Sequence, residues 1–201
     1  AASFYMLSVG NKDKIRVACV GDSITGGTDY PAYLWMLLGS TNYTVGNFGV
    51  GGSAVSLDSG SPYMNDSAFQ DAKKFQPNIV IIMLGTNDAN SVISPHNGSF
   101  VKDYVYLVSE FQALSSKPTI YLVKPPPVYS NGTTPSAEYL KTDVIPGIEQ
   151  VGKQTNSTII DVYSALANHS DFFPDGVHPD SEGAILIANQ INKAITSQKI
   201  P

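Results

Sequence analysis

The chain is short of charge and almost without cysteine, and both shortages narrow what it can be. Charged residues make up 14% of its 201 residues, against about 25% in a typical globular protein. A formal net charge of −5, with no cluster of Lys and Arg, argues against a nucleic-acid partner or an anionic membrane surface. Cys19 is the single cysteine, which excludes an internal disulfide. No unbroken apolar run reaches the roughly 18 residues of a membrane span, so none is expected.

Metal ligands are equally scarce. The three histidines, His96, His169 and His178, stand far apart, and none has a Cys or His at metal-ligand spacing. We therefore expect no metal site and no cofactor. The length fits one domain, and no linker, repeat or low-complexity tract divides it, so residues 1–201 are predicted to form a single domain.

Sequons for N-linked glycosylation, Asn-x-Ser/Thr, are over-represented. With 13 asparagines, and about a sixth of the chain Ser or Thr, roughly two sequons are expected by chance. Six are present, beginning at Asn42, Asn65, Asn97, Asn131, Asn156 and Asn168. Polar loops also produce sequons that carry no sugar, but the excess favours a secreted glycoprotein whose glycans supply the hydration that charges usually give.

Short apolar runs alternate with helical patterns along the chain. The spacing predicts strands at 15–20, 43–50, 78–84, 119–123 and 158–162. Helices are predicted at 32–38, 66–74, 100–114, 137–155 and 181–195, with Pro146 starting or kinking the fourth and Ser181 capping the last. Five apolar strands separated by helices indicate an α/β protein with a parallel sheet covered on both faces.

In such a sheet, ligands bind at the carboxyl edge of the strands. Polar, glycine-containing segments stand where this rule predicts chemistry: residues 21–25 after the first strand, 47–52 at the end of the second, 85–88 after the third and 175–179 after the fifth. The residues that carry the chemistry are therefore expected at this edge of the sheet.

Ser23 is the candidate nucleophile, and it needs a base beside it. His178 is the one histidine predicted at this edge with an acid close by. Asp175, three residues earlier, can accept the Nδ1 proton of His178, which leaves Nε2 free to take the Ser23 proton.

An oxyanion also needs hydrogen-bond donors. The candidates are the backbone N–H of Ser23 at a helix start, the N–H of Gly52 and the side-chain amide of Asn87. Gly49 and Gly51 compete with Gly52 for this role. Asp22 and Asp88 look catalytic, but their place in turns favours holding loop backbone.

These residues resemble the SGNH subgroup of the GDSL-type esterases and lipases. The four letters of the name SGNH correspond here to Ser23, Gly52, Asn87 and His178. The blocks GDSIT, GTND and DGVHP occur in the family's order, from about Ile15 to Ile195. The resemblance implies a three-layer α/β/α sandwich with a flavodoxin-like five-stranded sheet, an acyl-serine mechanism and no metal. Residues 124–129 and 172–179 look most like carbohydrate O-acetylesterases, including sialate and xylan acetylesterases.

The expected function is therefore a secreted, extracellular serine esterase that removes short acyl groups, acetyl above all, from a carbohydrate ester. Two alternatives stay open at this point. One is a lysophospholipase or thioesterase of the same family. The other is a non-catalytic surface or structural glycoprotein on the same scaffold, because fold does not fix function.

Overall fold

The computed structural model describes residues 14–131 and 134–198, and their strands form one parallel sheet. The order in the sheet is β2-β1-β3-β4-β5, the flavodoxin-like order. The register pairs Val17 with both Val45 and Ile79, and Ile81 with Tyr121. The strands are β1 (Ile15–Gly21), β2 (Tyr43–Gly49), β3 (Ile79–Met83), β4 (Thr119–Lys124) and β5 (Thr158–Asp161).

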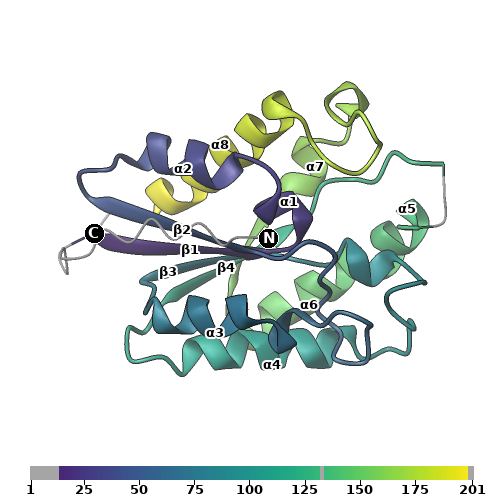
Figure 1. Ribbon diagram of the computed structural model, residues 1–201, viewed down its shortest axis with the longest axis horizontal. Helices are drawn as coiled ribbons and strands as arrows, with labels where there is room; N and C mark the ends of the chain where they lie inside the picture. The colour runs from purple at the N-terminus through teal and green to yellow at the C-terminus, as the bar shows by residue number, and fades with distance from the viewer. Residues whose placement is uncertain (1–13, 132–133, 199–201) are drawn as a thin grey trace.

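Helices cover both faces of this sheet, which gives the three layers seen edge-on in Figure 1. On one face lie α1 (Ser23–Gly26), α2 (Tyr30–Leu38), α7 (Val162–Ala165) and α8 (Ser181–Ser197). On the other lie α3 (Ser67–Lys74), α4 (Phe100–Gln112), α5 (Ala137–Tyr139) and α6 (Ile145–Thr155). Short turns of other helix types are η1 (Tyr63–Asn65), η2 (Asn87–Ala89), η3 (Leu140–Val144) and η4 (Ser170–Phe172).

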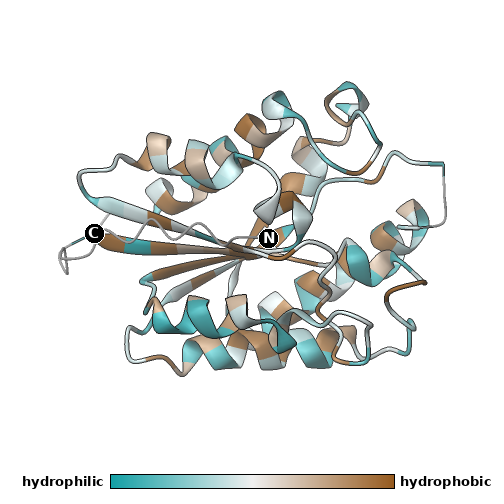
Figure 2. Cartoon of the chain, in the orientation of Figure 1, coloured by the Kyte–Doolittle hydropathy of each residue, from teal (hydrophilic) through white to brown (hydrophobic). Residues whose placement is uncertain are grey.

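Each strand contributes side chains to two cores, one on each face of the sheet, because successive side chains point to opposite faces. In β1, Val17 and Cys19 pack with α2 and α8, whereas Ala18 and Val20 pack with α3 and α4. Figure 2 shows the result: the strands are largely hydrophobic, and α3 is polar on the side away from the sheet. Cys19 is buried in the core, as its place in a strand predicts, and this burial raises the pKa of its thiol to about 12.

The predicted elements are confirmed to within a few residues, including the interruption at Pro146. There the chain passes from α5 through one π-helical turn, η3, into α6, whose first turn contains the proline. The cap of α8 was predicted wrongly. The N-cap is Asp180, whose Oδ1 accepts the Gly183 N–H at 3.0 Å, and Ser181 is the first helical residue.

Close backbone contacts at the carboxyl edge hold α1 against the ends of β1 and β2. A Cβ on Gly21 would lie 2.1 Å from the Thr25 hydroxyl, and one on Gly49 would lie 2.2 Å from the Gly26 nitrogen. Only glycine fits at either place without moving the backbone. These contacts place α1 directly at the carboxyl ends of β1 and β2.

Candidate active site

Ser23 is the first residue of α1, and only Asp22 lies between it and the end of β1. The capping role that its position suggests belongs to its neighbour, since Asp22 Oδ1 accepts the Ile24 N–H at 2.9 Å. The hydroxyl of Ser23 is therefore not used to cap the helix. As the first helical residue, Ser23 also has a backbone N–H with no partner inside the helix.

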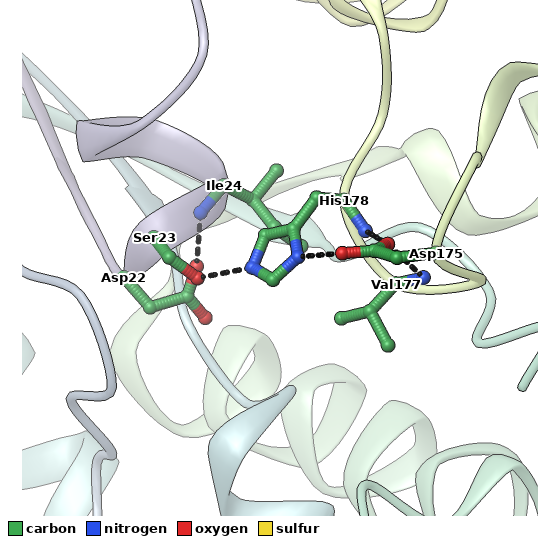
Figure 3. Close-up of polar contacts among 6 residues, drawn as sticks. All are labelled: Asp22, Ser23, Ile24, Asp175, Val177 and His178. Atoms are coloured by element: carbon green, nitrogen blue, oxygen red, sulfur yellow. Dashed lines mark hydrogen bonds and ion pairs between the residues drawn. The ribbon is translucent and has the colours of Figure 1, made fainter.

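Ser23, His178 and Asp175 lie in a hydrogen-bonded row (Figure 3). Ser23 Oγ is 2.9 Å from His178 Nε2, although 155 positions separate them. On the other side of the ring, His178 Nδ1 is 2.6 Å from Asp175 Oδ2. The structure thus brings together the three residues that the sequence predicted, in the predicted order.

The turn that carries His178 is exposed but well ordered by hydrogen bonds. Asp175 Oδ1 accepts the N–H of Val177 at 2.9 Å and that of His178 at 2.7 Å. Burial of part of the carboxylate would raise its pKa. The bonds from the His178 N–H, the His178 ring and the Val177 N–H outweigh this and lower the pKa of Asp175 to about 2. Asp175 is therefore ionised wherever an esterase would work.

The other candidate oxyanion donors are Gly52 and Asn87, which follow β2 and β3. Gly52 has φ +77°, a conformation that favours glycine, and its N–H donates no hydrogen bond within the described residues. The preceding Gly51 lies against the nucleophile, because a Cβ there would be 3.9 Å from that of Ser23. Asn87 Nδ2 donates one hydrogen to the Ser53 carbonyl at 2.9 Å, which leaves the second hydrogen for a ligand.

We call residues 51–56 the oxyanion loop, and two aspartates fix this loop and the residue after it. Asp88 accepts the N–H groups of Val55 and Ser56, each at 2.9 Å, and Asp103 of α4 accepts the Leu57 N–H at 2.8 Å. Holding loop backbone is the role that the sequence predicted for Asp88. Asp103 was missed, because an acid in the first turn of a helix is ordinarily interpreted as a favourable end charge.

Asp22 and Asp88 are buried carboxyl groups at this edge. Burial raises the pKa of Asp22 to about 7, partly offset by the Ile24 N–H and reinforced by Asp88. Burial also raises the pKa of Asp88, although the N–H groups of Val55 and Ser56 oppose the shift. Asp22 Oδ2 has no hydrogen-bond partner within the described residues. Its place next to Ser23 is therefore that of a buried cap and not of a second solvent-exposed base.

The other two histidines stand in polar segments, which predict solvent-exposed side chains, and that prediction is wrong. His96 stacks on Tyr139 with ring centroids 3.6 Å apart, and His169 stacks on Phe172 at 4.7 Å. Both are half-buried, because a flat ring in a polar loop still gains by covering apolar surface.

Across residues 14–131 and 134–198, no group of three or more His, Cys, Asp or Glu residues is arranged to hold a metal ion. Nor does any helix in those ranges have the length and hydropathy of a membrane span.

All six sequon asparagines are solvent-exposed. Asn42 directly precedes β2 and Asn156 lies two residues before β5, so both are at the amino edge of the sheet. The other four follow strands: Asn65, Asn97, Asn131 and Asn168. The third residue of the Asn131 sequon, Thr133, lies outside the described residues.

The fold and this geometry agree with comparisons to known proteins. Residues 19–185 match the GDSL-like lipase/acylhydrolase family. The chain belongs to that family. It is also 32% identical to an acetylxylan esterase of Xylanibacter ruminicola, over 92% of this chain and 44% of that protein. This GDSL-family chain therefore spans less than half the length of that curated relative.

Solved structures show the same GDSL-family fold at lower identity. An acetylxylan esterase of Geobacillus stearothermophilus superposes with TM-score 0.75 and 22% identity, covering 93% of this chain and 97% of that one. A carbohydrate acetylesterase of Sinorhizobium meliloti superposes with TM-score 0.72 and 18% identity, covering 92% of this chain and 99% of that one. An aryl esterase of M. smegmatis superposes with TM-score 0.74 and 17% identity, covering 91% of this chain and 99% of that one. At these identities, the likeness establishes the three-layer fold.

Proposed function

We propose that this chain is a serine esterase that hydrolyses short acyl esters, acetyl esters of carbohydrate above all, through an acyl-serine intermediate. The observation that carries the proposal is the unbroken row from Ser23 Oγ through the His178 ring to Asp175. A serine hydroxyl is a weak nucleophile, and this arrangement is the one that activates it. Membership of the GDSL-like family supports the same reaction class.

In the first step, Ser23 Oγ attacks the ester carbonyl carbon while His178 Nε2 takes the hydroxyl proton. Asp175 holds the ring with Nδ1 protonated and stabilises the imidazolium that forms. As the tetrahedral intermediate collapses, the bond to the alcohol oxygen breaks, and His178 gives its proton to that oxygen. The alcohol leaves, and the acyl group stays on Ser23.

In the second step, water attacks the acyl-serine, with His178 again taking a proton, and the acid leaves as Ser23 is restored. In both steps the carbonyl oxygen gains negative charge. The N–H groups of Ser23 and Gly52 and the free hydrogen of the Asn87 amide are the donors proposed to receive it. Each such donor contributes about 3–4 kcal/mol of transition-state stabilisation in serine hydrolases.

Two observations support acetyl esters of carbohydrate as the substrate class. The curated relative at 32% identity is an acetylxylan esterase, although it is more than twice as long as the matched segment. In addition, a hollow beside the oxyanion loop is lined by polar groups, among them Ser53, Ser61 and Asn65. Hydroxyls and amides suit the alcohol part of a sugar ester better than they suit a lipid tail.

Replacement of the nucleophile tests the reaction class. In Ser23→Ala, kcat for 4-nitrophenyl acetate should fall about 10⁴-fold or more, because the acyl-serine cannot form. A fluorophosphonate probe should label the parent protein at Ser23 and leave the variant unlabelled. Ser91→Ala, an exposed serine in the loop after β3, is the matched control and should keep its activity. Retention of more than a hundredth of the turnover in Ser23→Ala overturns the proposal.

A chain-length series on the parent protein tests the acyl group. kcat/KM should be highest for acetyl and fall through butyryl to octanoyl esters. A rise with chain length instead favours the lysophospholipase or thioesterase alternative.

We also propose that the protein is secreted and N-glycosylated. The threefold excess of sequons and the exposure of all six asparagines support this. Expression through a eukaryotic secretory pathway should give a protein whose mass falls on treatment with a peptide N-glycosidase. An unchanged mass contradicts the proposal.

A further inference from the structure

Two hollows flank the oxyanion loop, and a sequon asparagine lines each of them. The first is about 350 Å³ in volume and is lined by Gly51 and Ser53 of the loop and, across from them, by Asn65. The second is narrower and is lined by Ser56 at the far end of the loop, by Asp88 and by Asn97. The sequons at Asn65 and Asn97 are therefore close to the oxyanion loop on two different sides.

Backbone hydrogen bonds fix the position of Asn65 relative to the loop. Ala54, two residues after Gly52, donates to the Ser61 carbonyl at 3.0 Å and accepts from the Tyr63 N–H at 2.8 Å. Asn65 ends the short helix η1 that Tyr63 begins. Its side-chain amide donates no hydrogen bond to the described residues, and it is exposed, so it is free to carry a modification.

Asn97 is fixed on the other side by its own side chain. Its Oδ1 accepts the Ser99 N–H at 3.1 Å, and its Nδ2 donates to Asp58 Oδ2 at 2.7 Å. An N-glycosidic bond replaces only one of the two hydrogens on Nδ2. The remaining hydrogen can still donate to Asp58, so glycosylation is compatible with the contact that holds Asn97 in place.

We propose that N-linked glycans on Asn65 and Asn97 stand on either side of the oxyanion loop and restrict the alcohol part of the ester to groups that fit between them. This inference rests on the proposed function. Ser23 lies against Gly51, so the ester carbonyl must approach next to the hollow that Asn65 lines. A large, hydrated oligosaccharide there obstructs a bulky polymer while leaving a small ester free to enter.

The sequons can be removed without touching either asparagine. Ser67→Ala removes the first, and Ser67 is an exposed residue in the first turn of α3. Ser99→Ala removes the second, and the Ser99 hydroxyl makes no hydrogen bond within the described residues. Asn42→Gln removes a sequon at the opposite edge of the sheet and is the matched control.

The protein and its variants are to be secreted from a eukaryotic host, mapped by glycopeptide mass spectrometry, and assayed on 4-nitrophenyl acetate and on acetylated xylan. The parent should carry glycan at Asn65 and Asn97. In the double variant, the ratio of the polymer rate to the small-ester rate should rise about threefold or more, with kcat on the small ester unchanged. Asn42→Gln should leave the ratio unchanged.

Two results overturn this inference alone: unoccupied Asn65 and Asn97 in an active protein, or an unchanged ratio after occupied sites are removed. Absence of hydrolysis of 4-nitrophenyl acetate by every glycoform overturns the proposed function, and the inference with it.

Discussion

Asp175 stands at one end of the row in Figure 3 and Asp22 lies beside Ser23 at the other end, and their surroundings give the same side chain opposite properties. Asp175 is 56% exposed, but its two oxygens accept bonds from two N–H groups and a ring nitrogen, and its pKa falls to about 2. Asp22 is buried and accepts one N–H bond, and its pKa rises to about 7. Burial is the largest cause of the raised pKa at Asp22, whereas at Asp175 the hydrogen bonds from His178 and Val177 outweigh a smaller burial and lower the pKa.

The largest effect predicted from this comparison is in Asp175→Asn. Asparagine can keep the bonds from the Val177 and His178 N–H groups, but it loses the charge and favours the wrong ring tautomer of His178. kcat on 4-nitrophenyl acetate should therefore fall about 10⁴-fold.

Asp180→Asn is the control for that measurement, since Asp180 is in the same segment and asparagine caps a helix as well as aspartate does. Its kcat should stay within about twofold of the parent value. If Asp175→Asn keeps a tenth of the parent activity, the carboxylate is a structural element of the turn and not the partner of the base.

An intermediate effect is expected at Asn87, the candidate side-chain donor to the oxyanion. Asn87→Ala should lower kcat by about 10²–10³-fold, because it removes one oxyanion donor. The substitution also removes the bond to the Ser53 carbonyl, so thermal unfolding must be measured beside the kinetics. Asn90→Ala, three residues along, is the control, and its activity should be unchanged. A loss in kcat that Asn90→Ala shares contradicts a donor role for Asn87.

The smallest effect on activity, but a clear one on stability, is predicted for Asp22→Asn. Between the pKa of an unfolded aspartate, about 3.9, and the native value of about 7, native Asp22 keeps a proton that the unfolded chain has lost. The raised pKa therefore stabilises the fold below about pH 4, and that stability is lost as the pH rises to 7. Asparagine caps α1 equally well and has no proton to lose.

The free energy of unfolding of Asp22→Asn should increase relative to that of the parent as the pH rises from 4 to 7. The difference between the two should change by up to about 4 kcal/mol. Denaturant unfolding at several pH values measures this. A difference that does not change with pH means that Asp22 is charged throughout.

Much of this site could be predicted from the sequence because its parts are local. The apolar run before Gly85 specifies β3, and the blocks that hold Ser23 and Asn87 follow β1 and β3 closely, so the sheet topology brings these two residues to one edge. The block that holds His178 follows β5 only after α7 and η4, but it precedes α8 and so lies at the same edge. The Asp175–His178 pair is three residues apart and needs nothing distant to form.

The features that the sequence did not predict depend on distant contacts. The bond from Leu57 to Asp103 joins residues 46 positions apart, and no local pattern marks either partner. The stacking of His96 on Tyr139 likewise depends on how α5 packs beside the loop after β3. The cap at Asp180 rather than Ser181 is a different kind of miss, a one-residue choice between two good capping residues.

The 155-position span between the nucleophile and its base has a consequence for folding. Ser23 stands near the start of the chain, just after β1, the strand that pairs with both β2 and β3, whereas His178 lies on an exposed turn just before the last helix. In a chain with an intact sheet but an undocked α8, Ser23 would lack the contact with His178 on which the proposed esterase reaction depends. Turnover by that reaction would therefore report that the final segment has reached its place.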